Sequence, residues 1–184
     1  DSALWEPVYV AWNKGDCNLI EKESQTYLSK VPNGAHEISA HFYMATCYYT
    51  TDQTKSLEHY SFVISKPNNE HYEEALQYGA QISYANGDYS TANRNYHQLE
   101  LVAASTENIS TAIKKQMWCN WKLKDYPNSI VYADKVLNLS SLDDVTKVEA
   151  LRIKGLSLRE TRAYEEAIVV LRKCNKSTKS ISCS

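Results

Sequence analysis

The stretch of residues 71–102, HYEEALQYGAQISYANGDYSTANRNYHQLELV, decides the fold of this chain. Small or apolar residues recur in it every three or four positions, a spacing typical of amphipathic helices. They are Leu76, Gly79, Ala80 and Ser83 in the first half, and Ala92, Tyr96 and Leu99 in the second. Gly87-Asp88-Tyr89 separates the halves, and glycine takes at low cost the positive φ that ends a helix. The stretch therefore predicts two closely packed helices joined by a tight turn.

This turn recurs along the chain. Tyr126 and Tyr164 align with Tyr89. Upstream, the segments 15–17 and 51–53 align with the turn at residues 87–89. The step is roughly 36 to 38 residues, within the range of helical-hairpin repeats. Three positions after the aligned tyrosines stand the small residues Ala92, Ser129 and Ala167. Five copies of the turn predict five hairpins.

The units resemble the tetratricopeptide repeat (TPR) family. The clearest match is VEALRIKGLSLRETRAYEEAIVVLRKC, residues 148–174, which fills the family's packing positions with Leu151, Gly155, Leu158, Tyr164, Ala167 and Leu171. The fourth unit departs from the pattern, with Asn120 at a usually apolar position. The resemblance implies an all-α, right-handed α-solenoid of about five TPR-like hairpins with a concave inner side. The expected hairpins cover residues 1–34, 35–70, 71–105, 106–142 and 143–175, and a frayed tail covers 176–184.

Local signals also predict where particular helices begin. Proline is favoured in the first turn of a helix, so the first helix is expected to begin near Pro7. The second is expected to begin after Asn18, with Glu21 completing a capping box.

Composition excludes several classes of protein. The formal net charge is −2, which argues against a nucleic-acid partner, because such a partner requires a basic face. No apolar run approaches the roughly 20 residues of a membrane-spanning helix. The chain opens on Asp1 and shows no signal peptide, so a cytoplasmic protein and the mature piece of an exported protein both remain open.

The reactive residue types form no catalytic or metal-binding pattern. Five cysteines are present, Cys17, Cys47, Cys119, Cys174 and Cys183, and the first four replace small or apolar residues of the repeat. We interpret them as buried thiols, since a disulfide framework favours an even number. The histidines lack metal-site spacing, and no nucleophile pairs with a base. We therefore expect no enzyme activity, no metal and no cofactor.

A row of mostly aromatic residues is the one constellation that points to function. In TPR proteins the first helix of each hairpin lines the concave face. The residues expected there include Trp12, His41, Tyr48, Gln77, Tyr84, Lys114, Trp118, Trp121, Arg152 and Arg159. Aromatic rings give a large contact area at low entropic cost, which suits a groove that grips a peptide or helix. Packing of the same rings between hairpins remains the alternative interpretation.

The resemblance implies a non-enzymatic scaffold that binds another protein or peptide through this concave face. The Lys–Asn pattern with which some TPR proteins hold a C-terminal carboxylate is missing, because His41, Ala45, Gln77 and Gln81 stand there. One alternative is the sensory or regulatory region of a larger signalling or transcription-control protein. Carbohydrate binding by the aromatic row is a third.

Two further expectations concern assembly and location. The apolar run 168–171 in the last helix has no capping helix after it, so self-association through that end is a hypothesis. The segments 32–65 and 124–137 look like the long TPR proteins of Bacteroidetes-type bacteria. That resemblance implies the periplasm or cell envelope, with the cytoplasm as the alternative.

Overall fold

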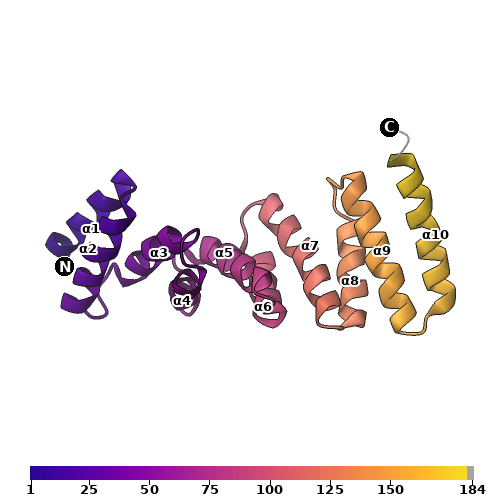
Figure 1. Cartoon of the computed structure of the whole chain (residues 1–184), viewed down its shortest axis with the longest axis horizontal. Helices are drawn as coiled ribbons and strands as arrows, with labels where there is room; N and C mark the ends of the chain where they lie inside the picture. The colour runs from indigo at the N-terminus through magenta and orange to yellow at the C-terminus, as the bar shows by residue number, and fades with distance from the viewer. Residues whose placement is uncertain (182–184) are drawn as a thin grey trace. The chain divides into compact units, whose positions relative to one another are not determined.

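The computed structural model describes residues 1–181, and these form ten α-helices and no strand (Figure 1). The prediction of an all-α chain of the α-solenoid class is confirmed. Contacts divide the chain into two compact units, and the boundary in the sequence lies between Ser83 and Tyr84, inside the fifth helix.

Unit 1 covers residues 1–83. Its helices are α1 (Ser2–Lys14), α2 (Cys17–Lys30), α3 (Glu37–Tyr48), α4 (Gln53–Ile64) and the greater part of α5 (Tyr72–Ala85). Unit 2 begins at Tyr84. It contains α6 (Tyr89–Val102), α7 (Thr106–Lys122), α8 (Tyr126–Leu137), α9 (Asp144–Glu160) and α10 (Tyr164–Ile181).

The predicted turn has one recurring geometry. A left-handed residue ends the first helix of four hairpins, with φ values of 66° at Gly15, 79° at Gly87, 60° at Lys124 and 65° at Arg162. In the first four hairpins an aspartate caps the second helix, because its carboxylate accepts the backbone N–H three residues on. These caps are Asp16, Asp52, Asp88 and Asp125, with N···O distances of 3.0 to 3.3 Å. The two features therefore occur together in the first, third and fourth hairpins. Asp16 therefore caps α2, and the prediction of Asn18 as its cap was wrong.

The start of α1 also differs from the prediction. The helix begins at Ser2 and carries Pro7 inside it. The backbone carbonyl of Asp1 accepts two amides of the first turn at 3.0 and 3.1 Å. Its carboxylate accepts the Tyr27 hydroxyl at 2.6 Å and the Ala35 amide at 3.1 Å. These contacts to residues distant in sequence stabilise a turn that the local rule for proline does not predict.

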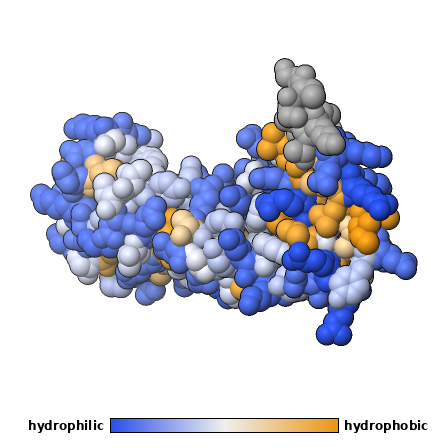
Figure 2. Space-filling model, turned by 45° about the vertical axis from the view of Figure 1, so that its right-hand side comes forward, coloured by the Kyte–Doolittle hydropathy of each residue, from blue (hydrophilic) through white to orange (hydrophobic). Residues whose placement is uncertain are grey.

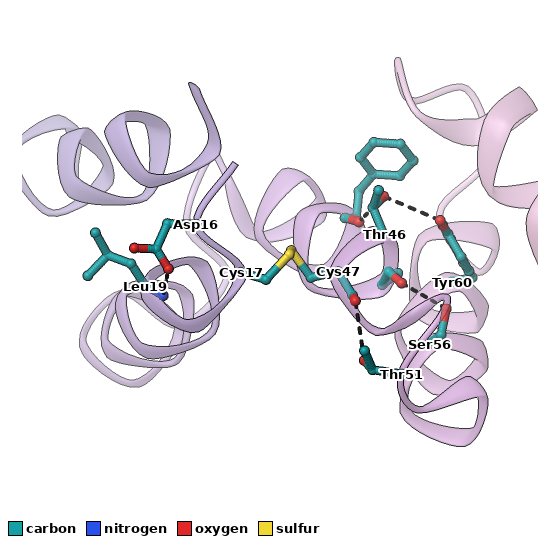
Figure 3. The surroundings of a disulfide bond; sticks show 10 residues. Asp16, Cys17, Leu19, Thr46, Cys47, Thr51, Ser56 and Tyr60 are labelled. Atoms are coloured by element: carbon teal, nitrogen blue, oxygen red, sulfur yellow. Dashed lines mark hydrogen bonds between the residues drawn. A yellow bond between two sulfur atoms is a disulfide. The ribbon is translucent and has the colours of Figure 1, made fainter. Parts of the chain in front are cut away.

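A disulfide joins Cys17 at the start of α2 to Cys47 near the end of α3, with the Cα atoms 5.4 Å apart (Figure 3). The interpretation of these two cysteines as buried thiols was therefore wrong. Folding brings the turn of the first hairpin against the following helix, which the odd number of cysteines does not reveal. Cys119 and Cys174 are buried, as predicted. Cys183 lies outside the described residues.

The last helix is longer than expected. α10 continues to Ile181, so it takes up most of the segment predicted as a frayed tail. The segment 175–181 contains no glycine or proline to end the helix. Upstream, Gly155 allows α9 and α10 to approach closely, because a Cβ atom there would lie 2.6 Å from the Leu171 side chain. The predicted tail residues 182–184 lie outside the described part of the chain.

Candidate protein-binding surface

Three of the predicted binding residues of unit 2 share one face of α7. Lys114, Trp118 and Trp121 are four and three positions apart, which places them on the same side of a helix. All three side chains are half-buried. Ile113 and Met117 of α7 belong to the apolar cluster of unit 2, and the half-buried Trp118 and Trp121 pack against the same cluster with part of their surface. The core thus determines which side chains α7 presents.

Cations lie over the aromatic rings of this face. The Arg152 guanidinium, from α9, lies 5.7 Å from the Trp118 ring centroid. The Lys115 ammonium lies 4.8 Å from the centroid of Tyr84. Exposed cation–π contacts stabilise by about 0.5–1 kcal/mol, so they orient these side chains and leave the cations hydrated on their outer sides. Unit 2 therefore carries a surface on which aromatic and basic groups alternate. We call the face formed by Lys114, Lys115, Trp118, Trp121 and Arg152 the basic–aromatic face.

Trp121 near the end of α7 and Arg159 near the end of α9 have different surroundings. The Trp121 ring is 5.4 Å from the ring of Tyr126, tilted by 58°. Arg159 is exposed and binds Glu160, with Nη2 2.8 Å and Nε 3.2 Å from the carboxylate. Exposed ion pairs of this kind contribute little to stability, so Arg159 remains available to exchange partners.

Burial controls ionisation beneath this surface. It raises the pKa of the Cys119 thiol to about 12, against a smaller lowering by Lys115. Burial also raises the pKa of Tyr84, and neighbouring groups raise it further. Both groups are protonated near neutral pH. Cys119 is therefore a packing residue and lacks the thiolate that a nucleophile requires.

In unit 1 the ring of Trp12 packs against the next hairpin. Trp12 of α1 stacks on Tyr43 of α3 with centroids 4.1 Å apart and an interplanar angle of 4°. Phe42 flanks the same indole at 6.4 Å. This contact joins consecutive hairpins. For Trp12 it therefore agrees with the alternative interpretation, in which the ring packs between hairpins. Gln77 lies half-buried on α5.

His41 and Tyr48 meet at one residue that the sequence reasoning missed, His59 of α4. The Nδ1 atoms of His41 and His59 are 2.8 Å apart. Tyr48 stacks on the His59 ring at 5.8 Å, and His41 stacks on Phe62 at 3.9 Å. Burial lowers the pKa of His41 to about 4, assisted by His59, and burial also lowers the pKa of His59. The pair is neutral near pH 7, so one ring donates a hydrogen bond to the other.

The structure thus splits the ten predicted residues. Trp12, His41, Tyr48 and Gln77 belong to unit 1, and the other six belong to unit 2, where α7 and α9 bring Trp118 and Arg152 together. The repeat alignment held a signal for the missed disulfide, because Cys17 occupies a turn slot and Cys47 a helix end of the next unit. The repeat alignment held no signal for His59, whose ring contacts His41 between the two helices of the second hairpin.

Residues 1–181 contain neither a metal-binding cluster nor a membrane-spanning helix. No cluster of three or more His, Cys, Asp or Glu side chains is placed there to hold a metal ion. None of the described helices combines the length and apolar character needed to cross a membrane.

Comparison with known proteins identifies the fold. No protein-family model matches the chain, and neither does any curated protein. Among solved structures, the chain is similar to a crystal structure of the MamA protein, with a TM-score of 0.62, 12% identity, and coverage of 98% of this chain and 93% of that one. It is also similar to MamA AMB-1, with a TM-score of 0.63, 12% identity and 97% of both chains covered.

A further similar structure consists of nearly identical TPR-like repeats from Podosopora anserina. Its TM-score is 0.61 at 10% identity, with 100% of this chain and 97% of that one covered. At such identities the likeness shows the fold alone. The chain therefore has the TPR-type helical-repeat fold.

Proposed function

We propose that this chain is a non-enzymatic scaffold that binds another protein or peptide, and that the basic–aromatic face is part of its concave binding surface. The observation that carries the proposal is the pairing of Arg152 with Trp118 on adjacent first helices, at 5.7 Å. Lys114 and Lys115 extend the same charge along α7.

The chemistry of this face indicates the kind of segment it would bind. Half-buried indoles provide anchoring area, and aromatic and arginine side chains dominate the energetics of many interfaces. The surrounding cations favour a partner segment that carries acidic residues next to apolar ones. Such electrostatic complementarity acts mainly on specificity and on the association rate.

The proposal is tested by comparing capture from a cell lysate by three folded forms of the chain. The first is the wild type, and the second carries Trp118→Ala and Arg152→Ala. The third carries Val131→Ala, a control at an exposed position of α8. A partner retained by the wild type and the control should bind the double variant at least tenfold more weakly, because a hot-spot truncation costs about 2 kcal/mol. Equal retention by all three folded forms excludes this face.

A second proposal concerns self-association. Figure 2 shows hydrophobic residues gathered on the C-terminal hairpin, and on α10 Tyr164, Ile168 and Val169 are each more than half exposed. An exposed apolar helix face of this kind is typical of a docking surface. We propose that a second copy covers it. Light scattering between 5 and 500 μM should then show dimers, and the variant Ile168→Asp/Val169→Asp should stay monomeric. A wild type that is monomeric throughout excludes this proposal.

The disulfide supports one of the two locations that the sequence left open. Disulfides persist in oxidising compartments and are rare in the cytosol. The Cys17–Cys47 bond therefore favours the periplasm or envelope over the cytoplasm. Peptide mapping of the protein from its native cells, with thiols blocked at lysis, should recover the two cysteines in one linked peptide. Recovery of both as blocked thiols would favour the cytoplasm.

A further inference from the structure

A polar groove lies on unit 2, on a side that the basic–aromatic face does not use. It is about 310 Å³ in volume and lies between α6, α7 and α8. The residues that line it include Asn93, Arg94, His97, Gln116, Asn120 and Tyr132. None of the residues of the basic–aromatic face lines it. The groove therefore constitutes a separate candidate site.

The floor of the groove consists of buried carboxamides. Gln116 is 1% exposed and Asn120 is 2% exposed. Asn120 accepts a hydrogen bond from Asn93 Nδ2 at 3.2 Å and donates one to the Gln116 backbone carbonyl at 2.8 Å. Gln116 Nε2 donates to Glu100 at 2.6 Å. Buried polar groups cost stability unless they are hydrogen-bonded, and apolar side chains at these two positions would remove that cost.

One atom in this network has no partner. Asn93 Oδ1 is buried and accepts no hydrogen bond. An unsatisfied buried acceptor costs about 1–3 kcal/mol. After a small rotation of the Asn93 side chain, an N–H or O–H group of a ligand in the groove would satisfy it. This atom therefore specifies a donor on the ligand.

The rim of the groove provides donors. Arg94 and His97 are exposed, and the Arg94 guanidinium makes one long hydrogen bond, 3.5 Å, to Thr91. No aspartate or glutamate occurs among the described residues that line the groove. The nearby Glu100 carboxylate is paired with Lys135 at 2.7 Å. The rim therefore favours an anionic acceptor group on the ligand.

Tyr132 adds a further donor. Burial, with a smaller contribution from Glu100, raises its pKa to about 12, so the phenol keeps its proton. Its hydroxyl lies 3.5 Å from His97 Nδ1. The lining contains no aliphatic side chain among the described residues, so it does not suit the apolar face of a helix. A ligand that combines a carboxylate with an adjacent N–H group would therefore complement both the rim and the floor of this groove.

We propose that this groove binds an extended acidic peptide segment. Arg94 and His97 bind a side-chain carboxylate of the segment, and Asn93 Oδ1 accepts a backbone N–H from it. Arg94 suits this role because its planar guanidinium can bind both oxygens of a carboxylate. The inference does not depend on the proposed function of the basic–aromatic face, because the two sites share no side chain.

The test is an NMR titration of the ¹⁵N-labelled chain with short peptides of defined sequence. The probe is acetyl-Ala-Asp-Glu-Ala-amide, and its neutral isostere is acetyl-Ala-Asn-Gln-Ala-amide. Maltose serves as a polar ligand without charge or amides. The side-chain NH₂ signals of Asn93, Asn120 and Gln116 report on the floor of the groove. The acidic probe should shift them saturably, and the isostere should bind at least tenfold more weakly.

Three variants complete the design. Arg94→Gln should weaken binding of the acidic probe at least tenfold, whereas Arg162→Gln, at an exposed position in another turn, should leave it unchanged. The pair Trp118→Ala/Arg152→Ala should also leave it unchanged, which separates this site from the basic–aromatic face. The inference is overturned by the absence of saturable shifts or by equal binding of the isostere. Stronger shifts with maltose, or an Arg94→Gln variant that binds like the wild type, would overturn it as well.

Discussion

Removal of the Cys17–Cys47 disulfide should destabilise unit 1 alone. The bond joins residues 30 positions apart in sequence. It therefore restricts the unfolded chain across α2, the loop that follows and α3 as far as Cys47. Replacing both cysteines by serine deletes this restriction and changes little else, since Cys17 is exposed and Cys47 half-buried.

The magnitude follows from the entropy of closing the loop. For 30 residues the chain-entropy relation gives about 12 cal/mol/K, or about 3.6 kcal/mol at 25 °C. This is a large fraction of the roughly 5–15 kcal/mol by which a typical domain is stable. Part of unit 1 should therefore open much more often in the variant.

Hydrogen exchange measured by mass spectrometry resolves the two units in one experiment. The slowest amides of α2 and α3 should lose about 3.6 kcal/mol of protection in Cys17→Ser/Cys47→Ser. Amides of α9 and α10 should keep theirs, and this makes unit 2 the internal control. Reduced wild type should match the variant, and reductant should leave the variant unchanged.

Two outcomes would refute the reasoning. A loss below about 1 kcal/mol would show that the bond does not constrain the unfolded chain as the loop length requires. An equal loss in α9 and α10 would show that the two units unfold together, which contradicts the local origin of the effect.

Three further predictions concern pH, helix capping and the core. Burial lowers the pKa of His41 to about 4, so the unfolded chain binds a proton at this residue more readily than the folded chain does. The stability contributed by neutral His41 is therefore complete above about pH 6.5 and falls as the pH drops toward 4. Urea unfolding at pH 7 and pH 4.5 should show a smaller difference in His41→Gln than in the wild type; an equal difference would contradict the assignment. Asp88→Ala removes the cap of α6 and should cost about 1 kcal/mol, whereas Asp88→Asn should cost only a few tenths, as read from the thermal midpoint; a similar loss in both would implicate the charge. Met117→Ala, in the core, should cost about 2–5 kcal/mol in urea unfolding. Val131→Ala, at the surface, should stay within about 0.5 kcal/mol, and equal effects would contradict the burial of Met117.

The secondary structure could be predicted because its signals are local. Asp88 and Gly87 stand together at a turn, and this pair alone specifies a left-handed residue followed by a helix cap. The same Gly-Asp pair stands at residues 15–16, and the remaining turns are found from their regular spacing along the chain. Local signals did not predict the start of α1, because Tyr27 and Ala35, which lie outside the helix, donate hydrogen bonds to the Asp1 carboxylate.

The candidate sites could be predicted only in part. The helical period places Lys114, Trp118 and Trp121 on one face without reference to any other element. Whether such a residue is used for packing depends on its neighbours in space. Trp12 is covered by Tyr43 of the next hairpin, whereas Trp118 has an arginine over its ring. Repeat position alone does not distinguish a ring that packs between hairpins from one that is proposed to bind a partner.

The sequence by itself determined the class of fold and the positions of the turns, because each depends on residues within about ten positions of one another. Only the tertiary structure decided that Cys17 bonds to Cys47, that His41 meets His59, and that Asn93 donates a hydrogen bond to Asn120 in the floor of a groove. These pairs are separated by 18 to 30 residues. Their contact depends on how the helices pack, and helix periodicity constrains the direction of a side chain without specifying its partner.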